Sequence, residues 1–145
     1  MTSALRIVVA DDEPDMRDYY RKILPRLGHT VVAAAETGND LIVQCRTHLP
    51  DLVIADIKMP DLDGIDAARK IYDERPVPVI LVSAYSTAIR IEHAEADPIM
   101  AYLVKPIKQS GLGPAIALAL CRFEQLETRR RQALTAQSPA EPRKP

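Results

Sequence analysis

Residues 52–64 read LVIADIKMPDLDG, and this stretch decides the fold class. Residues 52–55 are wholly apolar, which is typical of a short strand buried on both faces of a parallel sheet. The strand ends at Asp56, and the Asp, Pro and Gly residues between Ile57 and Gly64 favour a loop. A helical pattern follows at residues 65–74, so the stretch predicts a strand, a loop and a helix, the repeating unit of α/β folds.

The same alternation continues in both directions along the chain. Short apolar segments predict strands, and the segments between them have the 3.6-residue period of amphipathic helices. The predicted strands are 5–10, 30–35, 52–55, 79–82 and 101–104. The first predicted helix begins near Pro14, and the others span 38–48, 65–74, 86–96 and 110–134. Five such units in a row predict a doubly wound, five-stranded parallel sheet with helices on both faces.

Composition bounds the class of protein. The chain has 145 residues, of which 47% are hydrophobic and 27% charged, as expected for one globular domain with a real core. It has no apolar run long enough to span a bilayer and no signal-peptide flanks, so we expect a cytoplasmic protein without a membrane segment. Cys45 and Cys121 lie in helical patterns without a CxxC motif, and both are predicted to be buried apolar residues.

The charge is unevenly distributed. Residues 1–121 carry 13 Lys/Arg against 17 Asp/Glu, whereas residues 122–145 carry 6 against 3. An acidic domain argues against a nucleic-acid-binding core. The run of three arginines at 129–131 forms a small basic patch, for which a solvated helix face is the favoured interpretation.

Polar residues stand where the predicted strands end. Asp11 and Asp12 follow the first strand, Asp56 the third, Ser83 the fourth and Lys105 the fifth. Ligands of such sheets bind beyond the carboxyl ends of the strands, so these groups converge on one edge. Close carboxylate pairs repel by about 4 kcal/mol at an effective dielectric near 20. The cluster therefore needs a cation, and an all-oxygen donor set favours Mg²⁺.

Four motifs make a family resemblance. VVADDEPDM (8–16), IADIKMPDLDG (54–64), LVSAY (81–85) and AYLVKP (101–106) resemble the receiver domain of two-component response regulators, over about residues 4–123. The resemblance implies a flavodoxin-like fold with strand order 2-1-3-4-5. AEADPIMAYLVKPI (94–107) and GPAIALALCRFEQLE (113–127) are more similar to receivers attached to ANTAR-type RNA-binding antiterminators, although an ANTAR domain itself is not recognisable.

The resemblance also implies roles for the acidic residues. Asp56 would be the phosphoacceptor, a nucleophile that forms an acyl phosphate. Asp12 would bind Mg²⁺ directly and Asp11 through water, together with a carboxylate oxygen of Asp56 and the main-chain carbonyl of Lys58. Main-chain N–H groups near Lys58 and Ala84 would complete the phosphate cradle.

The remaining polar residues would contact the phosphoryl group and switch the protein. By resemblance, Ser83 and Lys105 would each bind a phosphoryl oxygen, with Lys105–Pro106 in the cis form, and Tyr102 would turn inward after phosphorylation. The alternatives are that Ser83 is only a helix cap and Tyr102 only a strand residue. We also expect the side chains of Lys58 and Tyr85 to tune dephosphorylation, because they border the path of the attacking water.

The predicted organisation is a receiver domain over 1–123, a helical extension over 124–134 and a disordered tail over 135–145. Along the last helix the apolar residues form a stripe with alternating spacings of four and three: Leu112, Ile116, Ala119, Phe123 and Leu126. Beyond the core this stripe favours a frayed extension over a homodimeric coil, and both remain open.

The leading hypothesis is a single-domain response regulator. It would accept a phosphoryl group on Asp56 from a sensor histidine kinase or phosphotransfer protein in a phosphorelay, switch its contacts with a downstream protein, and catalyse nothing else. One alternative is a phosphate-independent interaction module. Another is the receiver half of a regulator whose RNA-binding output domain is missing. A phosphohydrolase is disfavoured because the DxDxT pattern is absent.

Overall fold

The predicted strands form one parallel sheet. The computed structural model describes residues 4–84 and 99–137, and within them the strand order is β2-β1-β3-β4-β5. The strands are β1 (Arg6–Ala10), β2 (Thr30–Ala35), β3 (Leu52–Asp56), β4 (Val79–Ser83) and β5 (Ile99–Val104). The doubly wound sheet and its 2-1-3-4-5 order are therefore confirmed.

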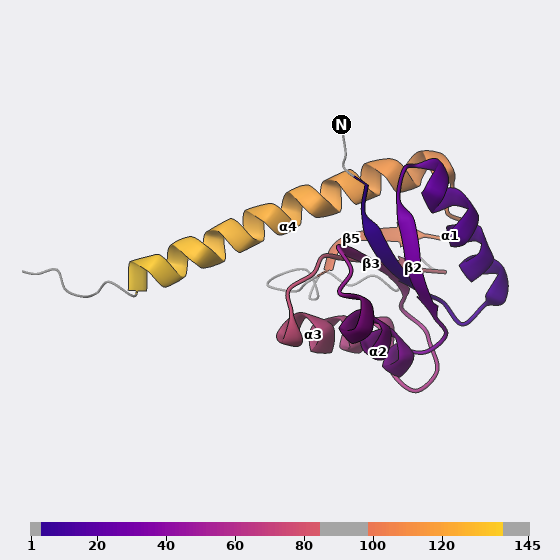
Figure 1. Ribbon diagram of the computed structural model, residues 1–145, viewed down its shortest axis with the longest axis horizontal. Helices are drawn as coiled ribbons and strands as arrows, with labels where there is room; N and C mark the ends of the chain where they lie inside the picture. Colours follow the sequence, from indigo (N-terminus) through magenta and orange to yellow (C-terminus); the bar gives the residue numbers. More distant parts are fainter. Residues whose placement is uncertain (1–3, 85–98, 138–145) are drawn as a thin grey trace, which may run out of the picture.

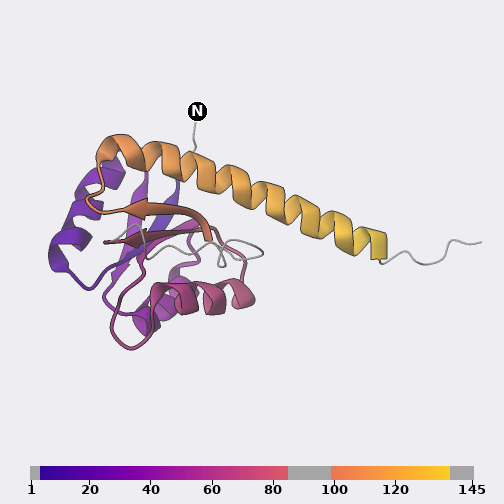
Figure 2. The ribbon, with the colours of Figure 1, turned by 180° about the vertical axis from the view of Figure 1, so that it is seen from behind.

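Four helices cover this sheet in the described part of the chain. They are α1 (Pro14–Arg26), α2 (Gly38–His48), α3 (Gly64–Glu74) and α4 (Gln109–Gln137). Helices α1 and α4 lie on one face of the sheet, and α2 and α3 lie on the other (Figures 1 and 2). The predicted helix 86–96 falls outside the described residues. None of the helices that the structure describes is long and apolar enough to cross a membrane.

Two hydrophobic cores lie on the two faces of the sheet. Successive residues of a strand point to opposite faces, so Ile7 and Val9 join the core under α1 and α4, while Val8 and Ala10 join the core under α2 and α3. All five residues of β3 and all five of β4 are buried. These strands are the rigid centre from which the polar residues at the sheet edge project.

The helices begin at residues suited to that position. Pro14 occupies the first turn of α1, where its missing N–H costs nothing. Thr37 caps α2 by accepting a hydrogen bond from the Asp40 N–H (3.0 Å), and Asp63 caps α3 by accepting one from the Asp66 N–H (2.8 Å). The second cap fixes the end of the loop that starts at Asp56.

Helix α4 is much longer than the sheet it covers. Its first half buries Leu112, Ile116 and Ala119, and its remaining residues extend away from the domain (Figure 1). Phe123 and Leu126 are half-buried and pack against the core under α1 and α4, so the chain itself partly covers them. The helix ends at Gln137, three residues beyond the predicted end.

The two cysteines differ. Cys45 is buried, as expected, but Cys121 is exposed, so the prediction of a buried Cys121 is wrong. The reason is helical geometry. At 100° per residue, position 121 points away from the buried stripe of α4 that Leu112, Ile116 and Ala119 form.

Candidate functional site

The backbone ladder of the sheet brings the predicted polar residues to one edge. Asp56 is the last residue of β3 and is paired with Val82, and Ser83 is the last residue of β4 and is paired with Val104. The main-chain N–H of Lys105 donates to the Ser83 carbonyl oxygen at 2.9 Å. Asp11 directly follows β1. The convergence expected from the strand ends is therefore present.

Three carboxylates form the centre of the site. Ligand oxygens of Asp11, Asp12 and Asp56 all lie within 4.8 Å of one another. Asp11 is fully buried, Asp56 is 7% exposed, and Asp12 is open to solvent. One carboxylate oxygen of Asp11, Oδ1, accepts a hydrogen bond from the Glu13 main-chain N–H at 2.9 Å. This bond anchors Asp11 and leaves its second oxygen to face the cluster.

One ammonium group balances part of this negative charge. Lys105 Nζ lies 3.0 Å from Asp11 Oδ2 and 3.4 Å from Asp56 Oδ2. Burial lowers the pKa of Lys105, but its contacts with Asp11 and Asp56 outweigh burial and raise the pKa above its usual value. The peptide bond between Lys105 and Pro106 is cis, as expected from the resemblance. The Tyr19 hydroxyl donates to the Ile107 carbonyl oxygen at 2.6 Å and ties the following loop to α1.

Glu13 is the site residue that the sequence reasoning missed. Its Oε1 lies 3.3 Å from Lys105 Nζ, so three carboxylates share this ammonium group. The sequence did offer a signal for Glu13, because it follows Asp11 and Asp12 directly. No role was predicted for Glu13. The side chain of Glu13 is 63% exposed. Its contact with Lys105 depends on the length and conformation of both side chains, which the periodicity of strands and helices does not specify.

The electrostatics of the cluster favour a bound cation. Burial, and next the charge of Asp11, raise the pKa of Asp56 to about 6, although Lys105 opposes this shift. The single ammonium therefore does not compensate the carboxylates. Because the donors are all carboxylate oxygens, the cluster fits a hard divalent ion such as Mg²⁺.

The loop after Asp56 is held close to the strand end. A Cβ on Gly64 would clash with the main-chain oxygen of Asp56, and the Gly64 N–H donates to the Ile57 carbonyl oxygen at 2.8 Å. Glycine is thus required for this close approach. Lys58 lies in the loop with an exposed side chain, and its main-chain carbonyl remains a predicted ligand. Tyr85 falls outside the described residues.

Ser83 and Tyr102 lie on neighbouring strands. Ser83 is buried at the end of β4, and Tyr102 is half-buried on β5, paired with Leu81. Leu81 and Tyr102 belong to the core under α2 and α3, and Ser83 lies two residues beyond Leu81. Side chains two apart share a face of the sheet, so Ser83 and Tyr102 share this one. This is the placement that the predicted switch requires, although the switch itself stays a prediction.

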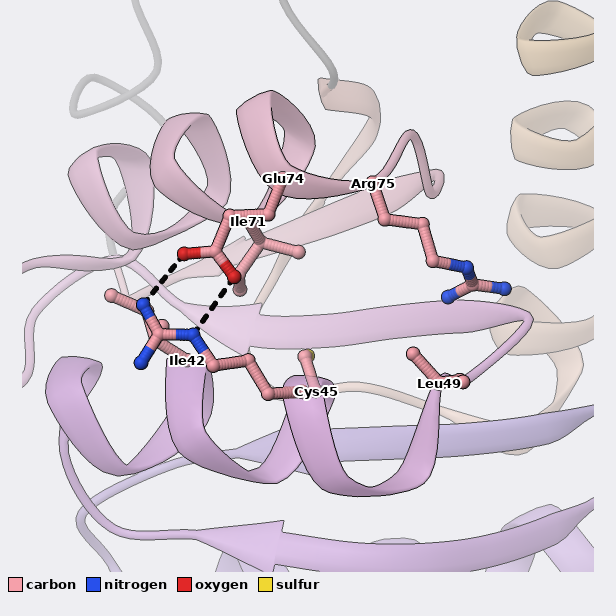
Figure 3. A pocket seen from close by; sticks show the side chains of 7 residues that line it. Ile42, Cys45, Leu49, Ile71, Glu74 and Arg75 are labelled. Atoms are coloured by element: carbon pink, nitrogen blue, oxygen red, sulfur yellow. Dashed lines mark hydrogen bonds and ion pairs between the residues drawn. The ribbon is translucent and has the colours of Figure 1, made fainter.

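A separate pocket lies away from the acidic cluster. It has a volume of about 260 Å³ and lies between the carboxyl-terminal ends of α2 and α3 (Figure 3). The Arg46 guanidinium donates two hydrogen bonds to Glu74 there, at 2.8 and 2.6 Å. Burial raises the pKa of the lining residue Cys45 to about 12, so its thiol is protonated at neutral pH and is no nucleophile.

Comparisons with known proteins agree with this site. Residues 7–117 match the family model of the response regulator receiver domain. The chain is 38% identical to the transcriptional regulatory protein PdtaR of Mycobacterium tuberculosis, over 96% of this chain and 68% of that protein. It is 34% identical to the response regulatory protein VC_A0850 of Vibrio cholerae, over 92% of this chain and 49% of that protein.

Solved structures give the same result. The signal receiver domain of the putative response regulator NarL from Mycobacterium tuberculosis has a TM-score of 0.73 at 27% identity, covering 83% of this chain and 98% of that one. The anti-anti-sigma factor PhyR from Bartonella quintana has a TM-score of 0.76 at 25% identity, covering 90% of this chain and 53% of that one. The strand order, the acidic cluster and these comparisons point to one family.

Proposed function

The chain belongs to the response regulator receiver domain family, and from this premise we propose that it accepts a phosphoryl group on Asp56 and thereby changes its protein contacts. The observation that supports this proposal most directly is the cluster of Asp11, Asp12 and Asp56, in which Asp56 Oδ2 lies 3.4 Å from Lys105 Nζ. The donor is the phosphohistidine of a sensor histidine kinase or of a phosphotransfer protein. Because receiver domains meet these donors in the cytoplasm, the proposal places the protein there. Apart from its own phosphorylation and dephosphorylation, the protein is not an enzyme.

The side chains at the sheet edge divide the work of phosphoryl transfer. A carboxylate oxygen of Asp56 attacks phosphorus, the bond from phosphorus to the donor nitrogen breaks, and that nitrogen keeps the electron pair and takes a proton from solvent. The product is an acyl phosphate on Asp56. Lys105 neutralises one phosphoryl oxygen and the Ser83 hydroxyl donates to another.

Asp11, Asp12, Asp56 and the main-chain carbonyl of Lys58 are the residues that would hold Mg²⁺. Such an ion would supply positive charge that offsets the repulsion between the carboxylates and an incoming phosphoryl group. The buried position of Asp11 and the raised pKa of Asp56 support this assignment, because an ion there offsets the cost of burying their charges.

Phosphorylation then acts as a switch. It adds about −1.5 to −2 charges to the site. In the proposal Ser83 moves toward the phosphoryl group, Tyr102 turns into the space left behind, and the surface around β5 changes its preference for a downstream protein. The shared face of Ser83 and Tyr102 supports this coupling. Energetically, the change is a population shift between two existing states.

The first test is the intact mass of the protein after incubation with Mg²⁺ and acetyl phosphate. We expect a gain of one phosphoryl group that requires Mg²⁺ and is lost in Asp56→Asn. Asp61→Asn is the matched control, because Asp61 is an exposed aspartate of the same loop with a φ of 65°, a conformation that asparagine tolerates. If Asp56→Asn is still phosphorylated, Asp56 is not the acceptor. If the wild type gains nothing from either acetyl phosphate or a histidine kinase, the alternative of a phosphate-independent interaction module replaces this proposal.

A second arrangement of the output has support of its own. The match to the transcriptional regulatory protein PdtaR covers nearly all of this chain, including α4, but only 68% of PdtaR. The chain can therefore act as a single-domain regulator or as the receiver half of a longer regulator with an RNA-binding output domain. An immunoblot of source cells with an antibody to the receiver distinguishes them, since the second arrangement predicts a band larger than this chain.

A further inference from the structure

A groove lies at the end of the sheet opposite Asp56. It has a volume of about 610 Å³ and runs between α4 and the amino-terminal ends of the strands. On the sheet side it is lined by the apolar Leu5 and Pro78, which precede β1 and β4, and by the carboxylate of Asp51, which precedes β3. On the α4 side it is lined by residues that include Leu120, Glu124 and Arg131. The groove thus joins an apolar floor to charges of both signs.

One face of α4 lines this groove and continues beyond it. Leu120, Glu124, Glu127 and Arg131 line the groove and follow one another at spacings of four, three and four. The next position in this series is Leu134, which is 66% exposed. We call these five residues the groove face. It has a leucine at each end and charged residues between them. It borders the stripe that packs on the core, since Leu120 also packs there and Phe123 also lines the groove.

We propose that the groove face binds the groove face of a second copy of this chain, with the two α4 helices antiparallel. A two-fold axis near residues 127–128 places Glu124 of each copy opposite Arg131 of the other. The same axis places Leu120 opposite the second copy's Leu134, so apolar residues also meet apolar residues. This interface is isologous, as most homodimer interfaces are.

The charges decide between the two directions of pairing. A parallel pair would set Glu124 against Glu124 and Arg131 against Arg131, and like charges in contact are unfavourable. In the antiparallel pair only Glu127 meets its own counterpart. Its Oε2 already accepts a hydrogen bond from the Tyr72 hydroxyl at 2.6 Å and lies 4.0 Å from Arg130 Nε. The charge of Glu127 is therefore partly compensated within each copy.

The dimer also gives the end of α4 a partner. Residues 129–135 are all exposed, and an isolated helical segment of this length is marginally stable in water. In the antiparallel pair, this part of each helix lies in the groove of the other copy. Leu134 then contacts the apolar residues Leu5 and Pro78 and leaves solvent. The interface lies away from the Asp56 site and does not require phosphorylation.

Charge reversal tests the pairing. The oligomeric state is measured by sedimentation equilibrium over a wide range of concentration for Glu124→Arg, Arg131→Glu and the double variant. Each single change turns two attractive pairs into repulsive ones, and we expect the dimer to weaken roughly ten-fold. The double variant restores the opposite charges and regains the wild-type dissociation constant. Arg129→Glu is the control, because position 129 lies on the opposite side of α4, and it leaves the dimer unchanged.

Three results would overturn the proposal. The first is a wild-type monomer at every concentration, in which case solvent or a different protein covers the groove. The second is a double variant no stronger than the single variants, since a parallel or unrelated dimer gains nothing from the exchange. The third is an equal effect of Arg129→Glu, which would indicate a response to net charge alone. Circular dichroism of each variant verifies that α4 is still helical.

Discussion

At the scale of single residues, three carboxylates compete for the ammonium group of Lys105. Its Nζ lies 3.0 Å from Asp11, 3.3 Å from Glu13 and 3.4 Å from Asp56. A phosphoryl group that arrives at Asp56 must take this ammonium from at least one of them. Asp11 and Asp56 belong to the acidic cluster that could hold a metal ion, whereas Glu13 does not, so Glu13 is the partner that can be removed without changing this cluster.

We expect Glu13→Gln to be phosphorylated faster than the wild type. The variant leaves Lys105 with less competition for the incoming phosphoryl oxygen. Because the side chain of Glu13 is 63% exposed, the ion pair is worth less than about 1 kcal/mol, which limits the gain in rate to about five-fold. The rate is measured with acetyl phosphate and Mg²⁺ by intact mass.

The control for this prediction is Asp15→Asn, which removes the same charge from an exposed position in the first turn of α1. It should leave the rate within experimental error. A Glu13→Gln rate equal to the wild-type rate would mean that Glu13 does not compete for Lys105, and a lower rate would mean that Glu13 helps to position Lys105.

At the scale of helices and strands, most bounds followed from the sequence. The predictions of residues 30–35 and 38–48 are confirmed residue for residue. Helix α2 begins at Gly38 because the Thr37 side chain caps it. Strand β5 begins at Ile99, two residues before its predicted start, because Ile99 and Met100 are buried in the sheet.

The convergence of the site was predictable for the same reason. Parallel strands end at a common edge, so Asp11, Asp56 and Ser83 had to meet there once the alternation of strands and helices was recognised. Contacts made by long side chains were not predictable, and the pairing of Tyr72 with Glu127 is an example. The two residues are 55 positions apart, and no periodicity links α3 to the far half of α4.

This contact predicts that α3 holds the extension of α4. The Tyr72 hydroxyl donates to Glu127 at 2.6 Å, and the Arg130 guanidinium carbon lies 4.9 Å from the centre of the Tyr72 ring. We expect Tyr72→Phe to lose about 0.5–1.5 kcal/mol of stability in this contact, because a half-buried carboxylate loses its donor. The loss should appear as faster amide hydrogen exchange in residues 124–137, measured by mass spectrometry.

Tyr19→Phe is the matched control, because it also deletes one tyrosine hydroxyl that donates at 2.6 Å, here to Ile107. It should affect exchange near the Lys105 loop and leave residues 124–137 unchanged. Equal exchange in the extension of Tyr72→Phe and the wild type would mean that the packing of Phe123 and Leu126 alone holds α4.

At the scale of the whole molecule, the burial of Asp56 in the acidic cluster lowers the stability of the fold. Burial, and next the charge of Asp11, raise the pKa of Asp56 to about 6 in the folded protein, compared with 3.8 for the free group. Between these values the folded state binds more protons than the unfolded state. The contribution of Asp56 to the free energy of unfolding of the metal-free protein therefore falls as the pH rises from about 4 to 6 and stays reduced above it.

We expect metal-free Asp56→Asn to be more stable than the wild type at pH 8, because asparagine has no charge to bury. Two pKa units correspond to about 3 kcal/mol, which is the upper limit of the gain. The difference shrinks toward zero only below about pH 3, where Asp56 is protonated in the folded and the unfolded state. Thermal or urea unfolding in the presence of EDTA measures it. Asp73→Asn, an exposed aspartate of α3, should show no such dependence.

Adding Mg²⁺ should reverse this order. An ion that binds only the folded state adds stability that grows with its concentration relative to the dissociation constant. The wild type, with three carboxylates, gains more from Mg²⁺ at pH 8 than Asp56→Asn does, and this gain disappears as the pH falls through about 6 because protonated Asp56 is a poor ligand. A Mg²⁺ effect that is equal in the two proteins would place the ion elsewhere. A metal-free Asp56→Asn protein less stable than the wild type at pH 8 would mean that Lys105 compensates Asp56 more fully than the geometry indicates.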